Sequence, residues 1–204
     1  MLLSLHVKNP NPRDLKKVLA LLDNDGVVIL PTDTIYAMVC KLDSKKGIDR
    51  MSKIMGKKPD KVFYSILCSD LSNISEVTAP IDKNIFRMLK NNLPGPFTFI
   101  LKANSQVAKY FAGNRKTVGI RVPDNEITQI VIKELGTPLV ASTIHHDDDI
   151  IEYMTDPLEI FEKFKHQVDL VVDGGAGGNV PSTIIDCTAE EPIIIREGKG
   201  FVNF

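Results

Sequence analysis

Apolar and polar residues alternate along this chain with two different periods. Short apolar runs bounded by turn residues predict strands, and longer stretches with apolar residues three or four positions apart predict helices. Asn11 followed by Pro12 is typical of a helix start, and Gly136 is typical of a helix end. The runs that predict strands cover 2–7, 26–31, 62–68, 97–102, 117–122, 138–142, 168–172, 183–185 and 192–195. The stretches that predict helices cover 12–24, 44–55, 81–93, 107–111, 126–135 and 156–164.

These elements predict the class of fold. Strands interleaved with helices in this way are typical of an α/β protein. The closing run of strands, separated by short turns, favours antiparallel pairs, so we expect a mixed sheet. No linker rich in glycine, serine or proline divides the 204 residues, so we expect one domain over 1–204 and no second C-terminal domain. The strand order does not follow from these patterns.

Composition then narrows the class of protein. Hydrophobic residues make up 43% and charged residues 25%, which argues against a disordered chain. A formal net charge of −1 excludes binding of nucleic acid by bulk charge, although it leaves room for a local basic patch. The three cysteines are far apart, so they predict neither a disulfide framework nor a metal site. With no signal peptide and no membrane segment in the sequence, we expect a cytoplasmic protein.

Two common nucleotide-binding signatures are missing from the sequence. It contains neither the GxxxxGK[ST] loop nor a GxGxxG motif after an expected strand, which excludes a P-loop ATPase and the usual dinucleotide fold. The run of two histidines and three aspartates at 145–149 offers possible metal ligands. Because consecutive residues rarely converge on one ion, we interpret this run as a solvated acidic loop.

A basic stretch at 45–61 follows the hydroxyl-rich turn at 32–34. On a helix, its cations Lys46, Arg50, Lys53 and Lys57 would share one face. The stretch is either a solvated helix face or a site for a phosphate or carboxylate ligand, since ligands collect at strand ends in α/β proteins.

Two other segments repeat this chemistry. Arg121 ends an apolar strand just before Pro123, where its side chain would project into solvent or a cleft and could bind an anion through two nitrogens. The glycine-rich segment 174–178, followed by Ser182 and Thr183, is either part of a ligand site or a hairpin whose glycines permit positive φ.

A set of short motifs, taken in order, resembles one known family. The motifs are 31–36 (PTDTIY), 94–98 (PGPFT), 118–123 (VGIRVP), 138–141 (PLVA), 173–175 (DGG) with 181–183 (PST), and 196–198 (REG). Together they resemble the YrdC / threonylcarbamoyl-AMP synthase family. The stretches at 87–92 (RMLKNN), 115–117 (RKT) and 167–170 (QVDL) are similar to the YciO-type branch of that family.

The resemblance implies a fold and an activity. The fold would be a twisted mixed sheet with flanking helices around a concave, positively charged cleft. The activity would be that of a nucleotidyltransferase that makes threonylcarbamoyl-AMP from L-threonine, bicarbonate and ATP for the t6A modification of tRNA. Mg²⁺ would accompany ATP to neutralise its phosphates. Some members are described as binding double-stranded RNA, so RNA or tRNA is a further implied partner.

The resemblance also implies roles for individual residues. Thr32 and Thr34 would contact threonine, and Arg121 would hold its carboxylate. Ser182 and Thr183 would close the site, and Arg196 would lie near the nucleotide. The other residues expected at substrate- or nucleotide-binding positions are Tyr36, Thr98, Ser142 and Thr143.

The chain departs from the family pattern at two motifs. Active synthases carry Lys-x-Arg before a proline, and here Gly56 and Lys58 stand at those two positions, while the family's Ser-x-Asn becomes Thr143 and His145. Lysine cannot reproduce the two-pronged contact of an arginine. Candidates to supply the missing charge in catalysis are Lys53, Lys57 and Lys58. Two hypotheses therefore remain: a synthase-like enzyme, or a divergent module that binds nucleotide or structured RNA in the cleft without efficient adenylation.

Overall fold

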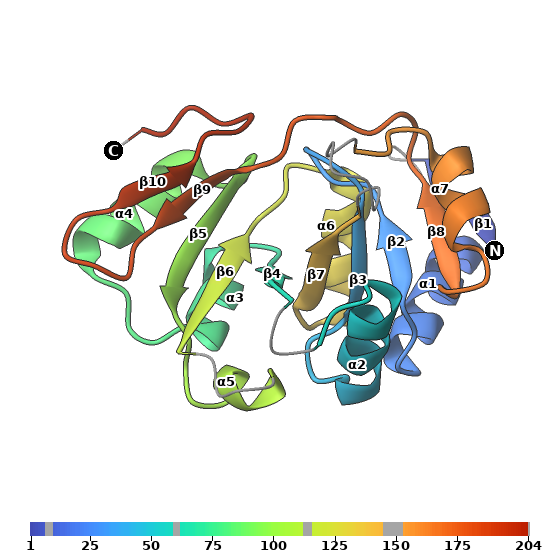
Figure 1. The fold of residues 1–204 in the computed structure, drawn as a ribbon, viewed down its shortest axis with the longest axis horizontal. Coiled ribbons are helices and arrows are strands. Elements are labelled where there is room, and N and C mark those ends of the chain that lie inside the picture. Colours follow the sequence, from blue (N-terminus) through green and yellow to red (C-terminus); the bar gives the residue numbers. More distant parts are fainter. Residues whose placement is uncertain (7–9, 59–61, 112–115, 145–152, 204) are drawn as a thin grey trace.

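The protein is described here from a computed structural model that covers residues 1–6, 10–58, 62–111, 116–144 and 153–203. Ten strands within these ranges form one sheet (Figure 1). The strands are β1 (Leu2–Ser4), β2 (Val28–Leu30), β3 (Ala37–Lys41), β4 (Ser65–Leu67), β5 (Phe97–Lys102), β6 (Thr117–Arg121), β7 (Leu139–Thr143), β8 (Leu170–Asp173), β9 (Thr183–Asp186) and β10 (Ile193–Arg196). The helices are α1 (Pro12–Asp23), α2 (Lys45–Ile54), α3 (Leu71–Val77), α4 (Lys83–Asn92), α5 (Val107–Tyr110), α6 (Glu126–Leu135) and α7 (Pro157–Phe164).

The sheet is mixed, which confirms the expected fold class. Its strand order is β1-β8-β2-β3-β7-β4-β6-β5-β9-β10. Strand β8 pairs in parallel with β1 and β2, and β5 pairs in parallel with β9, whereas β3 pairs antiparallel with β2 and β7. Strands β9 and β10 form the antiparallel pair expected at the end of the chain. Of the two alternatives for the glycine-rich segment, the hairpin between β8 and β9 is wrong, because six strands separate them in the sheet and the segment crosses from one to the other (Figure 1).

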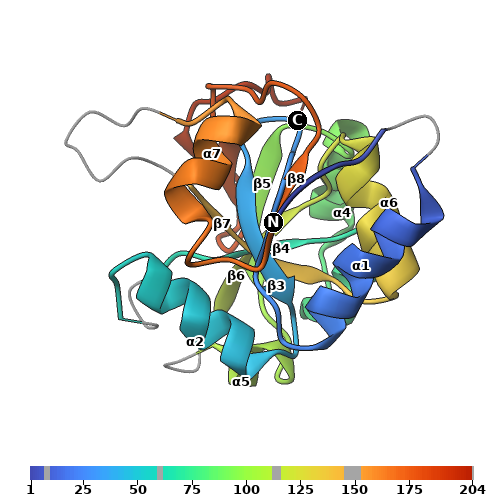
Figure 2. The ribbon, with the colours of Figure 1, turned by 90° about the vertical axis from the view of Figure 1, so that its right-hand side faces the viewer.

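Helices cover both faces of the sheet, as Figure 2 shows with α2 and α7 on one side and α1 and α6 on the other. The alternation of side chains along β2 explains this arrangement. Ile29 joins the core cluster on the side of α2 and α7, whereas Val28 and Leu30 join the cluster formed with α1 and α6. All three side chains have 0% exposure, so this strand is buried on both faces.

Polar side chains define where the helices begin and end. The Asn11 side chain accepts a hydrogen bond from the backbone NH of Arg13 at 3.0 Å, and Pro12 opens α1 as expected. Ser44 caps α2 by accepting from the NH of Gly47 at 2.9 Å. Gly136 ends α6 in the left-handed conformation with φ of 70°.

Two elements were not anticipated from the sequence. Strand β3 follows the 32–34 turn after only two residues, and helix α3 is a short helix capped by Asp70. The expected strand over 62–68 contracts to β4, because only Ser65–Leu67 pairs with β6 and β7. Of the described helices, none is long and apolar enough to cross a membrane.

Candidate functional site

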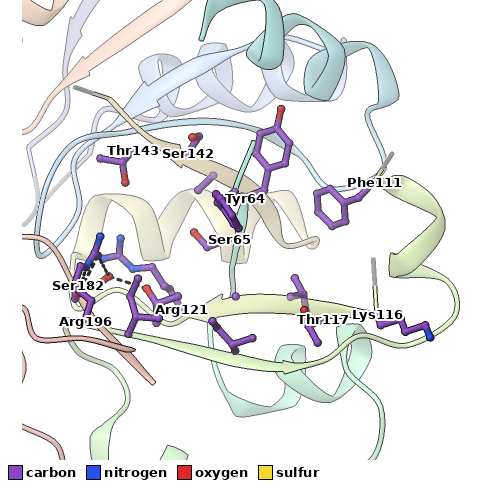
Figure 3. Close-up of a pocket in the computed structure, with 17 residues that line it drawn as sticks. Tyr64, Ser65, Phe111, Lys116, Thr117, Arg121, Ser142, Thr143, Ser182 and Arg196 are labelled. Carbon is purple, nitrogen blue, oxygen red and sulfur yellow. Dashed lines mark hydrogen bonds between the residues drawn. The ribbon is translucent and has the colours of Figure 1, made fainter. Parts of the chain in front are cut away.

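A cavity of about 510 Å³ opens where β4, β5, β6, β7 and β9 contribute residues to one surface (Figure 3). Cavities of this size hold small-molecule ligands in other proteins. Gly119 of β6 lines it, and an added Cβ would come within 3.1 Å of the Thr98 side chain and 3.6 Å of Ser65. Glycine at this position therefore avoids a crowded contact with Thr98, which also lines the cavity.

The cavity walls are cationic where they are charged. Among the described residues that line it, Lys116, Arg121 and Arg196 carry positive charge and none is acidic. Figure 3 places Arg121 and Arg196 together at one end and Lys116 at the other. Anionic groups would therefore meet positive charge at both ends of the cavity.

Hydroxyl groups lie beside the two arginines. Arg196 donates from Nη2 and Nε to the carbonyl oxygen of Ser182 at 2.8 and 3.2 Å. The Ser182 hydroxyl lies 2.7 Å from the hydroxyl of Thr98 on β5, which β5–β9 pairing brings next to it. Ser142 and Thr143 of β7 line the same end from the opposite wall. The arginine end thus combines two cations with hydroxyls that can donate to an anion.

Arg121 is held by a buried carboxylate from the β2–β3 turn. Its Nη2 donates to Asp33 Oδ1 at 2.9 Å, and the two side chains are each 7% exposed. The same nitrogen donates to the hydroxyl of Thr34 at 2.9 Å. Asp33 Oδ2 and Arg121 Nε have no hydrogen-bond partner within the described chain. The ion pair therefore uses one atom from each partner rather than the two-pronged geometry available to arginine.

Burial and the neighbouring acid act in opposite directions on Arg121. Burial lowers the pKa of its guanidinium, while the charge of Asp33 and the hydrogen bond to it raise the pKa again. Arginine remains protonated in proteins, so the side chain presents a permanent positive charge to the cavity.

The two threonines of the turn lie behind Arg121. Thr32 donates from its hydroxyl to the carbonyl of Ile35 at 2.7 Å and accepts from the NH of Thr34 at 3.1 Å. Both threonine side chains are buried and neither lines the cavity. The expected contact of Thr32 and Thr34 with the substrate L-threonine stays a prediction. In the structure, Thr32 makes hydrogen bonds within the turn and Thr34 accepts one from Arg121.

Tyr36 also faces away from the cavity. It donates from its hydroxyl to the carbonyl of Gly175 at 2.6 Å and accepts from the NH of Gly174 at 3.1 Å. Burial raises the pKa of this phenol. An added Cβ on Gly177 would approach the Tyr36 ring to 2.7 Å, and one on Gly178 would overlap the carbonyl oxygen of Thr34. The glycines therefore permit close packing against the threonine turn.

Thr183 binds the end of the chain rather than the cavity. Its hydroxyl donates to the carbonyl of Gly200 at 2.7 Å and accepts from the NH groups of Gly198 and Gly200 at 3.0 and 3.2 Å. Of the predicted Ser182–Thr183 pair, only Ser182 lines the cavity.

Aromatic side chains form the other end of the cavity. The rings of Tyr64 and Phe111 stack with centroids 5.8 Å apart and an interplanar angle of 22°. Phe63, Lys116 and Thr117 line the cavity nearby. The sequence does not predict this aromatic end of the cavity, because Tyr64 falls within the expected strand at 62–68 and Phe111 within the expected helix at 107–111.

The predicted lysines lie outside the described cavity. Lys53, Lys57 and Lys58 are exposed and do not line it. Lys57 does not share one helical face with Lys46, Arg50 and Lys53. Helix α2 ends at Ile54, and Gly56 turns the chain with φ of 62° before Lys57.

Other cations of the basic stretch serve the fold. Arg50 donates to the carbonyl of Gln167 at 2.6 and 3.1 Å and to Asp169 at 2.6 Å. Lys46 pairs with Asp25 at 3.3 Å. Lys61 and the run 145–149 lie outside the described residues. Within the described ranges, no three histidine, cysteine, aspartate or glutamate residues gather as metal ligands.

Comparison with known proteins gives the class to which this fold and cavity belong. The model of the Sua5/YciO/YrdC family, described as telomere recombination, matches residues 20–198. This chain is a member of the Sua5/YciO/YrdC family. It is 36% identical to the uncharacterized protein YciO of Escherichia coli over 201 residues, which cover 98% of this chain and 96% of that protein. The crystal structure of E. coli YciO superposes with a TM-score of 0.89 at 35% identity, covering 98% of this chain and 97% of that one.

More distant relatives have printed activities or ligands. A threonylcarbamoyl-AMP synthase of Bacillus subtilis is 27% identical over 195 residues, which cover 92% of this chain and 54% of that protein. The crystal structure of P. abyssi Sua5 complexed with L-threonine has a TM-score of 0.88 at 22% identity, covering 97% of this chain and 57% of that one. At that identity the second similarity shows the shared fold only. The family resemblance stated from the motifs is confirmed.

Proposed function

We propose that this protein is a threonylcarbamoyl-AMP synthase-like nucleotidyltransferase. In this reaction, the amine of L-threonine combines with bicarbonate to give a carbamate and water. A carbamate oxygen then attacks the α-phosphate of ATP, and pyrophosphate leaves. The observation that carries the proposal is the cavity with two arginines and several hydroxyls at one end, stacked aromatic rings at the other, and no acidic side chain among its described lining residues.

The arginine end suits the anions of this reaction. The carbamate of threonine and the triphosphate repel each other, so the protein must hold fixed positive charge where they meet. Arg121 would bind the threonine carboxylate, with Thr98 and Ser182 donating hydroxyl hydrogen bonds. Arg196 would face the phosphates. Because the described cavity offers no carboxylate, Mg²⁺ would be held by the phosphates of ATP and would neutralise part of their charge.

The aromatic end suits the base of the nucleotide. Tyr64 and Phe111 present apolar rings beside the cavity, and Lys116 lies at its edge. An adenine placed there would stack on an apolar surface while its phosphates extend toward Arg121 and Arg196. Lys53, Lys57 and Lys58 remain proposed suppliers of catalytic charge, and a variant that lacks Lys57 and Lys58 tests two of them.

Mass spectrometry of the reaction mixture tests the proposal. Purified protein is incubated with ATP, Mg²⁺, L-threonine and bicarbonate, and threonylcarbamoyl-AMP is quantified against a mixture without enzyme. The variant Arg196→Met should reduce the rate about a hundredfold, since it removes a fixed donor for the phosphates. The matched variant Arg13→Met removes an exposed arginine at the start of α1 and should leave the rate unchanged.

Absence of product would overturn the synthase proposal, and the departures from the family motifs define what would replace it. In the alternative, the protein binds nucleotide, double-stranded RNA or tRNA through its cationic cavity without adenylation. The exposed position of all three candidate lysines, away from the cavity, favours this alternative. ATP binding by calorimetry without product would indicate a divergent substrate, and RNA affinity that falls steeply with salt would indicate RNA binding.

A further inference from the structure

The end of the chain packs next to the arginine end of the cavity, against Pro181 and Thr183. After β10, residues 197–203, here called the C-terminal strap, turn back along the start of β9 (Figure 1). The backbone NH of Lys199 donates to the carbonyl of Pro181 at 2.8 Å, and Thr183 binds Gly198 and Gly200. Asn92 of α4 donates to the carbonyl of Asn203 at 2.8 Å and accepts from its NH at 2.9 Å. The strap is therefore fixed on both sides of Lys199.

From this strap, Lys199 reaches a distant part of the sheet. Its Nζ donates to the backbone carbonyl of Asp33 at 2.6 Å, across 166 residues of sequence. Asp33 follows β2, whereas the strap lies against β9, and five strands separate β2 from β9 in the sheet. The turn that holds Asp33 also contacts Arg121 of β6, which lines the arginine end of the cavity.

Asp33 is consequently held by two cations from two segments. Arg121 binds its carboxylate and Lys199 binds its carbonyl. Because Arg121 contacts Asp33 through one nitrogen and one oxygen, the ion pair alone leaves the guanidinium free to pivot about that contact. Together with the hydrogen bond from the same nitrogen to Thr34, the position of the turn that carries Asp33 then sets where the guanidinium lies in the cavity.

We infer that Lys199 is a positioning residue for substrate binding, which fixes the Asp33 backbone and thereby aims the Arg121 guanidinium at the carboxylate of the amino-acid substrate. This inference rests on the proposed function for the identity of that substrate. The link from the strap to the turn is a property of the fold and can be tested without any substrate.

The variant Lys199→Met tests the inference, because methionine keeps much of the side-chain length and removes the ammonium. Lys199 is exposed, so the variant should fold. The matched control is Lys17→Met, which removes an exposed lysine that also makes one contact, to Asp14 at 2.9 Å on α1. The conservative variant Lys199→Arg retains a cationic donor and should restore most of the wild-type behaviour.

Calorimetry with L-threonine and steady-state kinetics provide the first readout. Lys199→Met should raise the Kd and the KM for L-threonine about five- to tenfold while kcat stays within about twofold, since a lost charge-assisted hydrogen bond acts on binding. In an Arg121→Met background, Lys199→Met should add nothing, because the residue that it positions is gone. An effect on kcat alone, or full additivity with Arg121→Met, would overturn the inference.

Hydrogen exchange provides the second readout and does not depend on the substrate. Backbone amides of residues 32–36 should exchange faster in Lys199→Met than in wild type or in Lys17→Met. If wild type does not bind L-threonine but the exchange rates respond as expected, the proposed function fails and the positioning link stands. If exchange in 32–36 is the same in all three proteins, the link itself is wrong, whatever the protein binds.

Discussion

The buried pair of Asp33 and Arg121 gives the sharpest test of how the site is built. Replacing Arg121 by methionine removes the cation and leaves the Asp33 carboxylate, 7% exposed, without its charged partner. Removing one member of a buried pair costs about 3–5 kcal/mol of folding free energy, because the remaining charge stays desolvated. Asp33→Asn should cost a similar amount by leaving the Arg121 guanidinium unpaired.

Urea unfolding followed by far-UV circular dichroism measures this loss. The chain contains no tryptophan, so the backbone signal is the suitable probe. With an m-value of about 2–3 kcal/mol/M, a loss of about 4 kcal/mol lowers the unfolding midpoint by about 1–2 M urea. The m-value itself should remain unchanged if the variant keeps the native fold.

The double variant Asp33→Asn/Arg121→Met decides whether the pair is the cause. Once both charges are removed, no unpaired charge remains buried, so the double variant should be more stable than the sum of the single losses predicts by about 2 kcal/mol or more. The exposed pair of Lys17 and Asp14, at 2.9 Å, is the control and should couple by about 0.5 kcal/mol or less. Additive losses in the Asp33–Arg121 cycle would refute the argument, because each side chain would then act through contacts other than the pair.

Three further predictions concern other parts of the protein. Gly178→Ala should destabilise the fold and lower the urea midpoint, because the new methyl group overlaps the carbonyl of Thr34; an unchanged midpoint would contradict the close packing of the glycine segment. Burial raises the pKa of the Cys187 thiol to about 12. Its alkylation by iodoacetamide at pH 8 should therefore be about a thousandfold slower than in the unfolded chain, and the rate should rise about tenfold per pH unit. Rapid labelling of the native protein would contradict this prediction. If the exposed Lys57 and Lys58 attract the nucleotide, the double variant Lys57→Ala/Lys58→Ala should raise the KM for ATP several-fold at low salt and less at high salt. Kinetics equal to wild type at both salt concentrations would show that these lysines do not contribute to ATP binding.

Local sequence signals predicted much of the fold. The caps at Asn11 and Gly136 marked real helix ends, because a cap is satisfied by groups within a few residues of itself. Strand β5 and helix α6 matched their expected bounds for the same reason, since their apolar periods are long enough to be unambiguous. These elements depend on interactions between residues a few positions apart, so a short stretch of sequence is enough to predict them.

The strand order could not be predicted from such windows. Strand β3 was missed because its apolar residues follow the 32–34 turn so closely that no separate element is visible. The segment 174–178 was open to interpretation as a hairpin, since glycine serves tight turns and close packing equally well. The strand order excludes the hairpin, and Gly177 packs against Tyr36 while Gly178 packs against Thr34. Both contacts join residues that are far apart in the sequence.

The candidate site shows the same limit in its charges. The dense run of cations at 45–61 favoured an anion site in the sequence. In the structure, Arg50 binds Gln167 and Asp169. The lysines at 53, 57 and 58 are exposed and lie outside the cavity. Isolated Arg121 proved to line the cavity, held by an aspartate 88 residues away in sequence. A run of charges has enough solvent around it to need no partner, whereas a single arginine at the end of an apolar strand is buried by its neighbours and requires one. In this chain, the burial of a lone cation is therefore a better guide to which charged side chain lines the cavity than the local density of charge.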